Sequence, residues 1–275
     1  MKNRFWAALV ALAVVGTVFS FAVRPSAGQA RPAAASNIPR AFDGKPDLNG
    51  IWQALTTANW DIQDHAARQG PMPQLGALFN FPAGQGVVVG NTIPYKPEAL
   101  AKKKENQTNW NKLDPEAKCY MGGIPRSNYM PYPFQIVQAP RRMLFAYEFA
   151  GGARTIYMNS KDEAPVDTWM GWSRGRWEGD TLVIDVTGLN GEAWFDRSGN
   201  FQSPMTHIVE RYTFINRDAL NYEVTVEDPS IYTQPWKMTL PLYRHLERNT
   251  QLLEYKCVEF AEEMLYGHLR KPGSK

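Results

Sequence analysis

Short apolar segments that alternate with polar residues dominate the second half of the chain. Turn residues separate them into nine predicted strands: 134–138, 143–149, 153–159, 169–177, 181–187, 206–214, 220–228, 236–243 and 251–259. No helical pattern lies between them, so neighbouring strands are expected to pair antiparallel rather than through βαβ units. The sequence therefore predicts a mainly β protein: an antiparallel up-and-down barrel or strongly curved sheet of about eight or nine strands.

The alternation also predicts the register of two hairpins. In the first, a two-residue turn at Gly179-Asp180 sets apolar residues opposite apolar residues and charges opposite charges. The expected pairs are Trp177 with Leu182, Gly175 with Ile184, and Arg174 with Asp185.

The second hairpin joins 206–214 to 220–228 through a turn centred on Arg217. One face is apolar, and a slip of one residue would place apolar side chains against charges. The other face pairs His207 with Glu227 and Arg211 with Glu223, and points either to solvent or into a barrel lumen. Glu210 falls on the apolar face, where a carboxylate must be paired or protonated, which makes it an acid/base candidate.

The first half of the chain has a different pattern. Residues 31–46 are rich in proline and small residues and predict an exposed linker. Pro97 and the segment after it predict one helix that ends before Asp114. Residues 61–92 lack a sustained period and predict irregular structure. We expect an N-terminal arm over 47–130 packed on a β domain over 131–260, followed by a tail over 261–275.

The first thirty residues carry basic residues, an apolar run and a small-residue end, the pattern of a secretory signal peptide. A membrane anchor is the alternative, because the run is close to the length that spans a bilayer. Removal of 1–30 takes the formal charge from +3 to zero, since the segment holds three basic residues and no acidic one. We expect a periplasmic or secreted protein that binds neither nucleic acid nor membrane beyond the signal peptide.

Two cysteines, Cys119 and Cys257, lie outside the predicted signal peptide. In an oxidising compartment an isolated pair predicts one disulfide across a long loop, and two buried thiols are the alternative. The four histidines show no metal-binding spacing, and nucleotide-binding loops are absent, so no metal or cofactor is expected.

The remaining chemistry centres on His207. With Glu227 or Asp196 beside it, His207 could transfer protons, and Arg154 or Arg211 could stabilise an oxyanion. Asp196 also has an alternative interpretation as a turn former. Aromatic residues in segments rich in Gly and Pro are candidates for ligand contacts, although most tryptophans of a barrel fill its core. The ligand-binding candidates are Tyr129, Tyr132, Arg154, Trp169 and Trp194.

Two resemblances bear on these expectations. Gly50-Ile51-Trp52 on an early strand, followed by a strand meander, resembles the G-x-W signature of lipocalin-like (calycin) barrels, although residues 55–133 intervene before the second strand. The segments GKPDLNGIW, RGRWEGDTLVIDV and VERYTF resemble an uncharacterised group of secreted bacterial proteins with a GKPDLxGxW motif. The lipocalin resemblance implies a barrel that binds a small ligand.

Three functions are compatible with the sequence. The first is an exported protein that binds a small apolar or aromatic-compatible ligand in the mouth of a barrel. The second is a cofactor-independent periplasmic lyase, isomerase or hydrolase that uses His207 as acid or base. The third is a structural or interaction module of the cell envelope.

Overall fold

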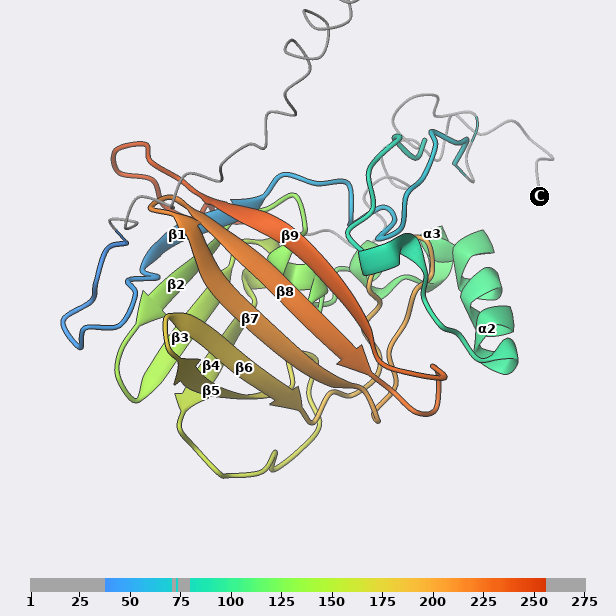
Figure 1. The fold of residues 1–275 in the computed structure, drawn as a ribbon. Helices are drawn as coiled ribbons and strands as arrows, with labels where there is room; N and C mark the ends of the chain where they lie inside the picture. The colour runs from blue at the N-terminus through green and yellow to red at the C-terminus, as the bar shows by residue number, and fades with distance from the viewer. Residues whose placement is uncertain (1–37, 71–72, 74–79, 256–275) are drawn as a thin grey trace, which may run out of the picture. The chain divides into compact units, whose positions relative to one another are not determined.

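A computed structural model describes residues 38–70, 73 and 80–255, and within them nine strands form one closed barrel in sequence order (Figure 1). The strands are β1 (Gly50–Ala54), β2 (Phe134–Gln138), β3 (Arg142–Tyr147), β4 (Ala153–Met158), β5 (Trp172–Glu178), β6 (Thr181–Thr187), β7 (His207–Asn216), β8 (Ala219–Glu227) and β9 (Trp236–Arg244). The mainly β class and the barrel are confirmed.

The barrel closes through β1, which pairs antiparallel with both β2 and β9. The Trp52 side chain of β1 is fully buried, and its indole N–H donates to the Leu48 carbonyl at 2.9 Å. The Arg244 guanidinium, at the end of β9, lies 4.2 Å from the centroid of the Trp52 ring. A cation over the face of a buried indole is attracted by the ring quadrupole, so this contact fastens the two strands where the barrel closes.

Two expectations about the strands are wrong. β4 and β5 pair in parallel, with Ile156 opposite Ser173, because the chain crosses back over residues 159–171 before β5 begins. A parallel pair needs a connection of about a dozen residues or more, which this segment supplies. Residues 251–255 of the predicted last strand are not strand, and 256–259 lie outside the described residues. β1 takes the place beside β9 instead.

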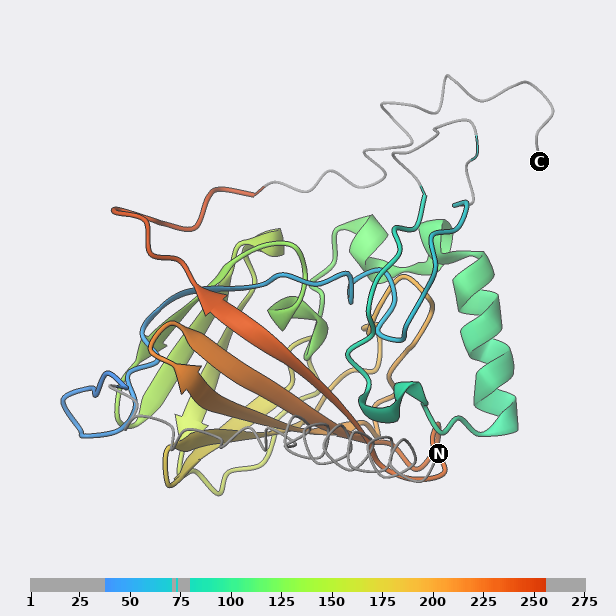
Figure 2. The same ribbon diagram turned by 45° about the horizontal axis from the view of Figure 1, so that its top comes forward.

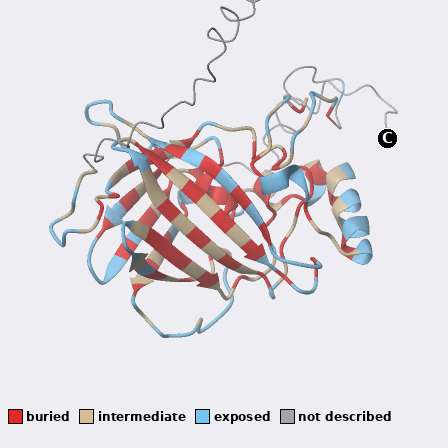
Figure 3. Ribbon diagram, in the orientation of Figure 1, coloured by how far each residue is buried: buried red, intermediate tan, exposed pale blue. Residues whose placement is uncertain are grey.

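Both predicted hairpin registers are confirmed. β5 and β6 pair Trp177 with Leu182, and β7 and β8 pair His207 with Glu227 and Tyr212 with Tyr222. Buried and more accessible residues alternate along these strands (Figure 3). The apolar face fills the interior of the barrel, because a barrel of this size has room for little beyond its own side chains.

The predicted helix is present as two pieces beside the barrel, α2 (Pro97–Thr108) and α3 (Trp110–Leu113), which meet at Asn109 (Figures 1 and 2). Short 3₁₀ turns complete the described helical structure: η2 (Val89–Asn91), η3 (Pro115–Lys118), η4 (Arg126–Asn128) and η5 (Phe149–Gly151). No helix in the described ranges is long and apolar enough to cross a membrane.

The predicted irregular segment contains a two-stranded arm ribbon, residues 61–70 and 80–88. Its two sides are joined by bridges between His65 and Gly84 and between Arg68 and Phe81. The predicted signal peptide, residues 31–37 of the linker, the tail and Cys257 lie outside the described residues, so the Cys119–Cys257 disulfide stays a prediction. The described part of the linker is attached to the β5–β6 turn, since Arg40 makes two hydrogen bonds to Asp180, at 2.6 and 2.7 Å.

Candidate functional site

The polar face that carries His207 lies on the outside of the barrel. His207 Nε2 is 2.9 Å from Asp185 on β6, and its Nδ1 is 3.4 Å from Glu227 on β8. The hydrogen bond to Asp185 raises the pKa of His207, and the same bond, with one from Arg174, holds the pKa of Asp185 at about 2. These contacts are cross-strand ion pairs on a partly exposed surface, not an enclosed catalytic pocket.

Arg211 belongs to the same outer face. Its guanidinium donates to Glu178 at 2.9 Å, and across the hairpin it faces Glu223. The outer face is therefore a set of paired charges that spans β5 to β8. Neither His207 nor Arg211 lines either of the two pockets described below.

Glu210 and Arg154 meet inside the barrel. Two hydrogen bonds, at 2.7 and 3.1 Å, join the Arg154 guanidinium to the Glu210 carboxylate, and both side chains are excluded from solvent. Bidentate geometry is the strongest form of such a pair, and it compensates part of the cost of burying two charges. The structure thus brings Glu210, the acid/base candidate, together with Arg154, a candidate for stabilising an oxyanion. The two form an ion pair that solvent does not reach.

Further polar groups complete this interior cluster. The hydroxyls of Tyr212 and Tyr222 donate to Glu210 at 3.0 and 2.7 Å, and Asn128 of η4 donates to it at 3.0 Å. Tyr147 donates to the carbonyl oxygen of the Asn128 amide. Every group except the Nε of Arg154 has a partner among the described residues. A buried network satisfied in this way specifies one arrangement of the chain.

Asp196 is buried elsewhere, in the loop between β6 and β7. Its carboxylate accepts from the Ile62 backbone N–H at 2.9 Å and from the Asn200 side chain at 2.6 Å. Burial, with the nearby Asp61 carboxylate second, raises the pKa of Asp196 to about 7, although these donors oppose the shift. The group holds the loop against the arm ribbon and does not meet His207.

The aromatic candidates are separated. Tyr129 is buried and donates to the Phe195 carbonyl at 2.9 Å, so it is part of the core. Tyr132 packs on Phe149 and on Tyr255. Trp169 stacks on Tyr120, with ring centroids 5.1 Å apart. Trp194 is buried in a cluster with Phe81 and Trp110. Of the candidates, Trp194 lies closest to a described pocket, because two of its neighbours line one.

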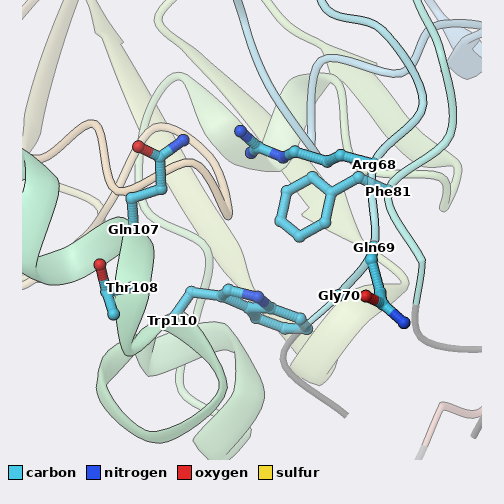
Figure 4. Close-up of a pocket in the computed structure, with 7 residues that line it drawn as sticks. All are labelled: Arg68, Gln69, Gly70, Phe81, Gln107, Thr108 and Trp110. Carbon is cyan, nitrogen blue, oxygen red and sulfur yellow. The ribbon is translucent and has the colours of Figure 1, made fainter. Parts of the chain in front are cut away.

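That pocket, the Arg68 pocket, lies between the arm ribbon and the end of α2, with a volume of about 250 Å³ (Figure 4). The arm supplies its polar and aromatic wall, and the helices supply the opposite side. The lining residues are Arg68, Gln69, Gly70, Phe81, Gln107, Thr108 and Trp110. Figure 4 shows the Arg68 guanidinium beside the Phe81 ring and directed toward Gln107, with Trp110 below.

The Arg68 guanidinium is held in place from behind. It lies 4.1 Å from the centroid of the Phe81 ring and donates to the Ser198 hydroxyl oxygen at 2.7 Å. Ser198 in turn donates to Asp61 at 2.5 Å. The Gln107 amide faces the guanidinium with the nitrogen drawn toward it in Figure 4; turning the amide over satisfies both groups, and its oxygen then accepts from Arg68 at 2.7 Å. About a third of the Arg68 side chain stays exposed, so a positioned cation faces the pocket.

Aromatic rings form the apolar wall of the pocket. Phe81 lies 5.1 Å from Trp60 and 5.8 Å from Trp110, in edge-to-face contacts. The Arg197 guanidinium lies 4.3 Å from the Trp60 ring centroid and is paired with Glu116. Edge-to-face packing is a favoured geometry for aromatic rings, so these contacts stabilise the wall.

Sequence reasoning missed Arg68, Phe81 and Gln107. The first two lie in a segment without periodicity, where no pattern indicates which side chains meet, and Gln107 is one of many polar residues on a helix. Trp110 is the one signal available in the sequence, as an indole at the end of a strongly polar helix. Among the described residues, no group of three or more histidine, cysteine or acidic side chains is arranged to hold a metal ion.

The fold and the site define a closed nine-stranded barrel with a small arginine-containing aromatic pocket outside it. No protein-family model matches the sequence, and no curated protein matches it.

Proposed function

We propose that this protein is an exported small-molecule-binding protein whose ligand combines an anionic group with a small apolar or aromatic body. The ligand occupies the Arg68 pocket rather than the mouth of the barrel. The observation that carries the proposal is the Arg68 guanidinium, which is fixed by Ser198 and Phe81 yet partly exposed at the edge of an aromatic pocket.

The lining chemistry supports an anionic group. Arg68 presents N–H donors in a planar arrangement that matches a carboxylate. The Gln107 carbonyl accepts from Arg68 without an ion pair, so a ligand carboxylate can replace it at little electrostatic cost. Asp61 forms an ion pair with the guanidinium at 3.8 Å, a long distance for such a pair, and Ser198 hydrogen-bonds to both groups.

The pocket size and its walls limit the rest of the ligand. A volume of about 250 Å³ is below the range of drug-sized sites, which begins at roughly 300 Å³. Phe81 and Trp110 offer ring surface to a planar apolar group. A single aromatic ring with one carboxylate therefore represents the ligand class.

The alternative of an enzyme that uses His207 has less support. His207 lines neither described pocket, and its ring nitrogens are both engaged with carboxylates on the barrel surface. Export remains part of the proposal, supported by the pattern of residues 1–30, and cell fractionation with N-terminal sequencing of the recovered protein tests it.

The binding proposal is tested by titrating the full mature chain into 4-fluorobenzoate and measuring the change in the ¹⁹F NMR signal of the benzoate. Arg68→Met is expected to weaken binding about tenfold or more, because a charge-assisted pair is lost. Lys104→Met is the matched control: it removes one positive charge from α2 but does not line the pocket. The neutral analogue 4-fluorobenzyl alcohol is expected to bind the wild type more weakly than the benzoate.

The proposal is wrong if Arg68→Met and Lys104→Met weaken benzoate binding equally, since attraction would then be nonspecific. It is also wrong if the wild type binds the benzoate and the alcohol equally. Circular dichroism of each variant shows whether the fold is retained. Should Arg68→Met fail to fold, Arg68→Lys provides the second variant: it keeps the positive charge but loses the planar set of donors, so it should also weaken benzoate binding.

A further inference from the structure

A second pocket lies beside β9, between the part of the strand that pairs with β1 and the part that contacts the arm ribbon. β1 pairs with β9 only as far as Leu242, and the arm ribbon contacts it at Met238 and Thr239. Between these contacts lies Pro241, which has no backbone N–H and therefore needs no acceptor from a neighbouring strand. The chain leaves this short length of edge uncovered.

The pocket at this position, the edge pocket, has a volume of about 420 Å³ and is lined by residues 55–57, 84–87 and 239–241. Its lining contains no charged side chain. Leu55 and Pro241 supply exposed apolar surface, and Leu55 is 74% exposed at the rim. An ion would lose its hydration here without a compensating charge, so the walls favour an uncharged ligand with an apolar body.

Two buried polar atoms beside this pocket have no hydrogen-bond partner among the described residues: the hydroxyl oxygen of Thr57 and Nε2 of His65. Nδ1 of His65 lies 2.7 Å from the Gln63 carbonyl oxygen, so Nδ1 carries the proton and Nε2 is left as an acceptor. Most buried polar groups are hydrogen-bonded, so two unpartnered ones side by side call for an explanation.

Gly84 brings these two side chains together. A Cβ at position 84 would lie 1.7 Å from the Thr57 hydroxyl oxygen and 3.0 Å from Cε1 of His65, so both groups pack against the same Cα. Only glycine permits this approach. Thr57 and Gly84 both line the edge pocket.

We propose that the edge pocket is a second binding site, for a small uncharged molecule that carries a hydroxyl group on an apolar body. Rotation about the Cα–Cβ bond of Thr57 turns its oxygen toward the pocket, where it accepts a hydrogen bond from the ligand hydroxyl. The ligand thereby supplies the partner that the Thr57 hydroxyl lacks, and this site does not depend on the Arg68 pocket.

The test compares two probes of similar size, 4-fluorophenol, which donates a hydrogen bond, and 4-fluoroanisole, which does not. In ¹⁹F NMR titrations of the full mature chain we expect the phenol to bind about three- to tenfold more tightly. Thr57→Val keeps the shape of the side chain and removes the hydroxyl, so this preference should vanish. Thermal stability should not fall, because the wild-type hydroxyl has no partner to lose.

Lys104→Met is the control and should leave the preference for phenol unchanged, because Lys104 lies on α2 and lines neither described pocket. Leu55→Glu places a charge on the exposed rim, where folding tolerates it, and should weaken both probes. The inference is overturned if the wild type shows no preference, or if Thr57→Val retains it. It is also overturned if amide shifts caused by the phenol fall outside residues 55–57, 84–87 and 239–241.

Discussion

The side-chain nitrogen of Asn128 lies 3.0 Å from Oε1 of Glu210 and so attaches the η4 turn to the middle of β7, inside the barrel. The same nitrogen is 2.8 Å from the Tyr222 hydroxyl on β8. Because Glu210 is also paired with Arg154 on β4, one carboxylate joins η4 to strands β4, β7 and β8 of the barrel wall. The interior charges therefore organise the fold rather than present a reactive group.

The Arg154–Glu210 pair gives the first prediction. Glu210→Leu should lower the free energy of unfolding by about 3–5 kcal/mol, because it leaves an unpaired guanidinium in the barrel interior. The double variant Arg154→Met with Glu210→Leu should recover most of that loss, since no buried charge remains. Urea unfolding measures both. Equal stability of the single variant and the wild type would show that the interior is hydrated and the pair unimportant.

The second prediction concerns pH. The raised pKa of His207 means that its protonated form stabilises the folded state below about pH 6.5 and that this contribution is lost as pH rises through the folded-state pKa. The pKa of Asp185, lowered to about 2, gives stability that is present above about pH 4 and is lost as pH falls toward 2.

The two windows overlap between about pH 4 and 6.5, so His207→Gln should cost most stability there and much less at pH 9. Both side chains are partly exposed, and the effect should shrink in high salt. The urea midpoint of His207→Gln and of the wild type at pH 5.5 and 9 measures this. A loss that is the same at both pH values would rule out the ion pair as its cause.

The third prediction concerns the arm ribbon. A Cβ at Gly86 would lie 2.4 Å from the Asp64 backbone nitrogen and 2.5 Å from the Gln63 carbonyl carbon, so Gly86→Ala must displace backbone. We expect a clear loss of stability and weaker binding in the edge pocket. Gly152→Ala is the matched control, because its nearest contact is an ordinary 3.7 Å and its backbone is extended. If both variants melt at the same temperature, the close approach at Gly86 is not required.

The fourth prediction is the disulfide between Cys119 and Cys257. Peptide mapping without reductant should recover the two cysteines in one linked fragment, and the chain should show no reactive thiol when unfolded. Reduction should then lower stability by up to about 4–5 kcal/mol, because the bridge closes a long loop. Recovery of two separate alkylated cysteines from unreduced protein would refute the pairing.

Local patterns in the sequence were sufficient for much of the barrel. Alternation and a glycine-containing turn predicted that Arg174 faces Asp185 and His207 faces Glu227, because hairpin register depends on nearby residues. The position of Glu210 on the inward face followed from the same alternation. Its partner did not, since Arg154 lies three strands away around the barrel and no local rule relates β4 to β7.

The sequence pattern also did not predict how the barrel closes. β1 lies close to the start of the chain yet pairs with β9, and nothing within Gly50–Ala54 indicates that partner. The Arg68 pocket had the least sequence signal, because its walls come from a nonperiodic ribbon and a helix end. Trp194 came nearest to it, as an aromatic residue in a loop, and lies in the cluster behind the pocket.

The parallel contact between β4 and β5 has a consequence for the number of strands. In a closed ring, strand directions can alternate all the way round only if the strand count is even, and this ring has nine. One parallel neighbour is therefore a geometric requirement of closure, and residues 159–171 are the segment that meets it. If a tight hairpin replaced that segment, β5 to β9 would all reverse and β9 would meet β1 in the wrong direction. The expected product is an open sheet with two free edges rather than a smaller barrel.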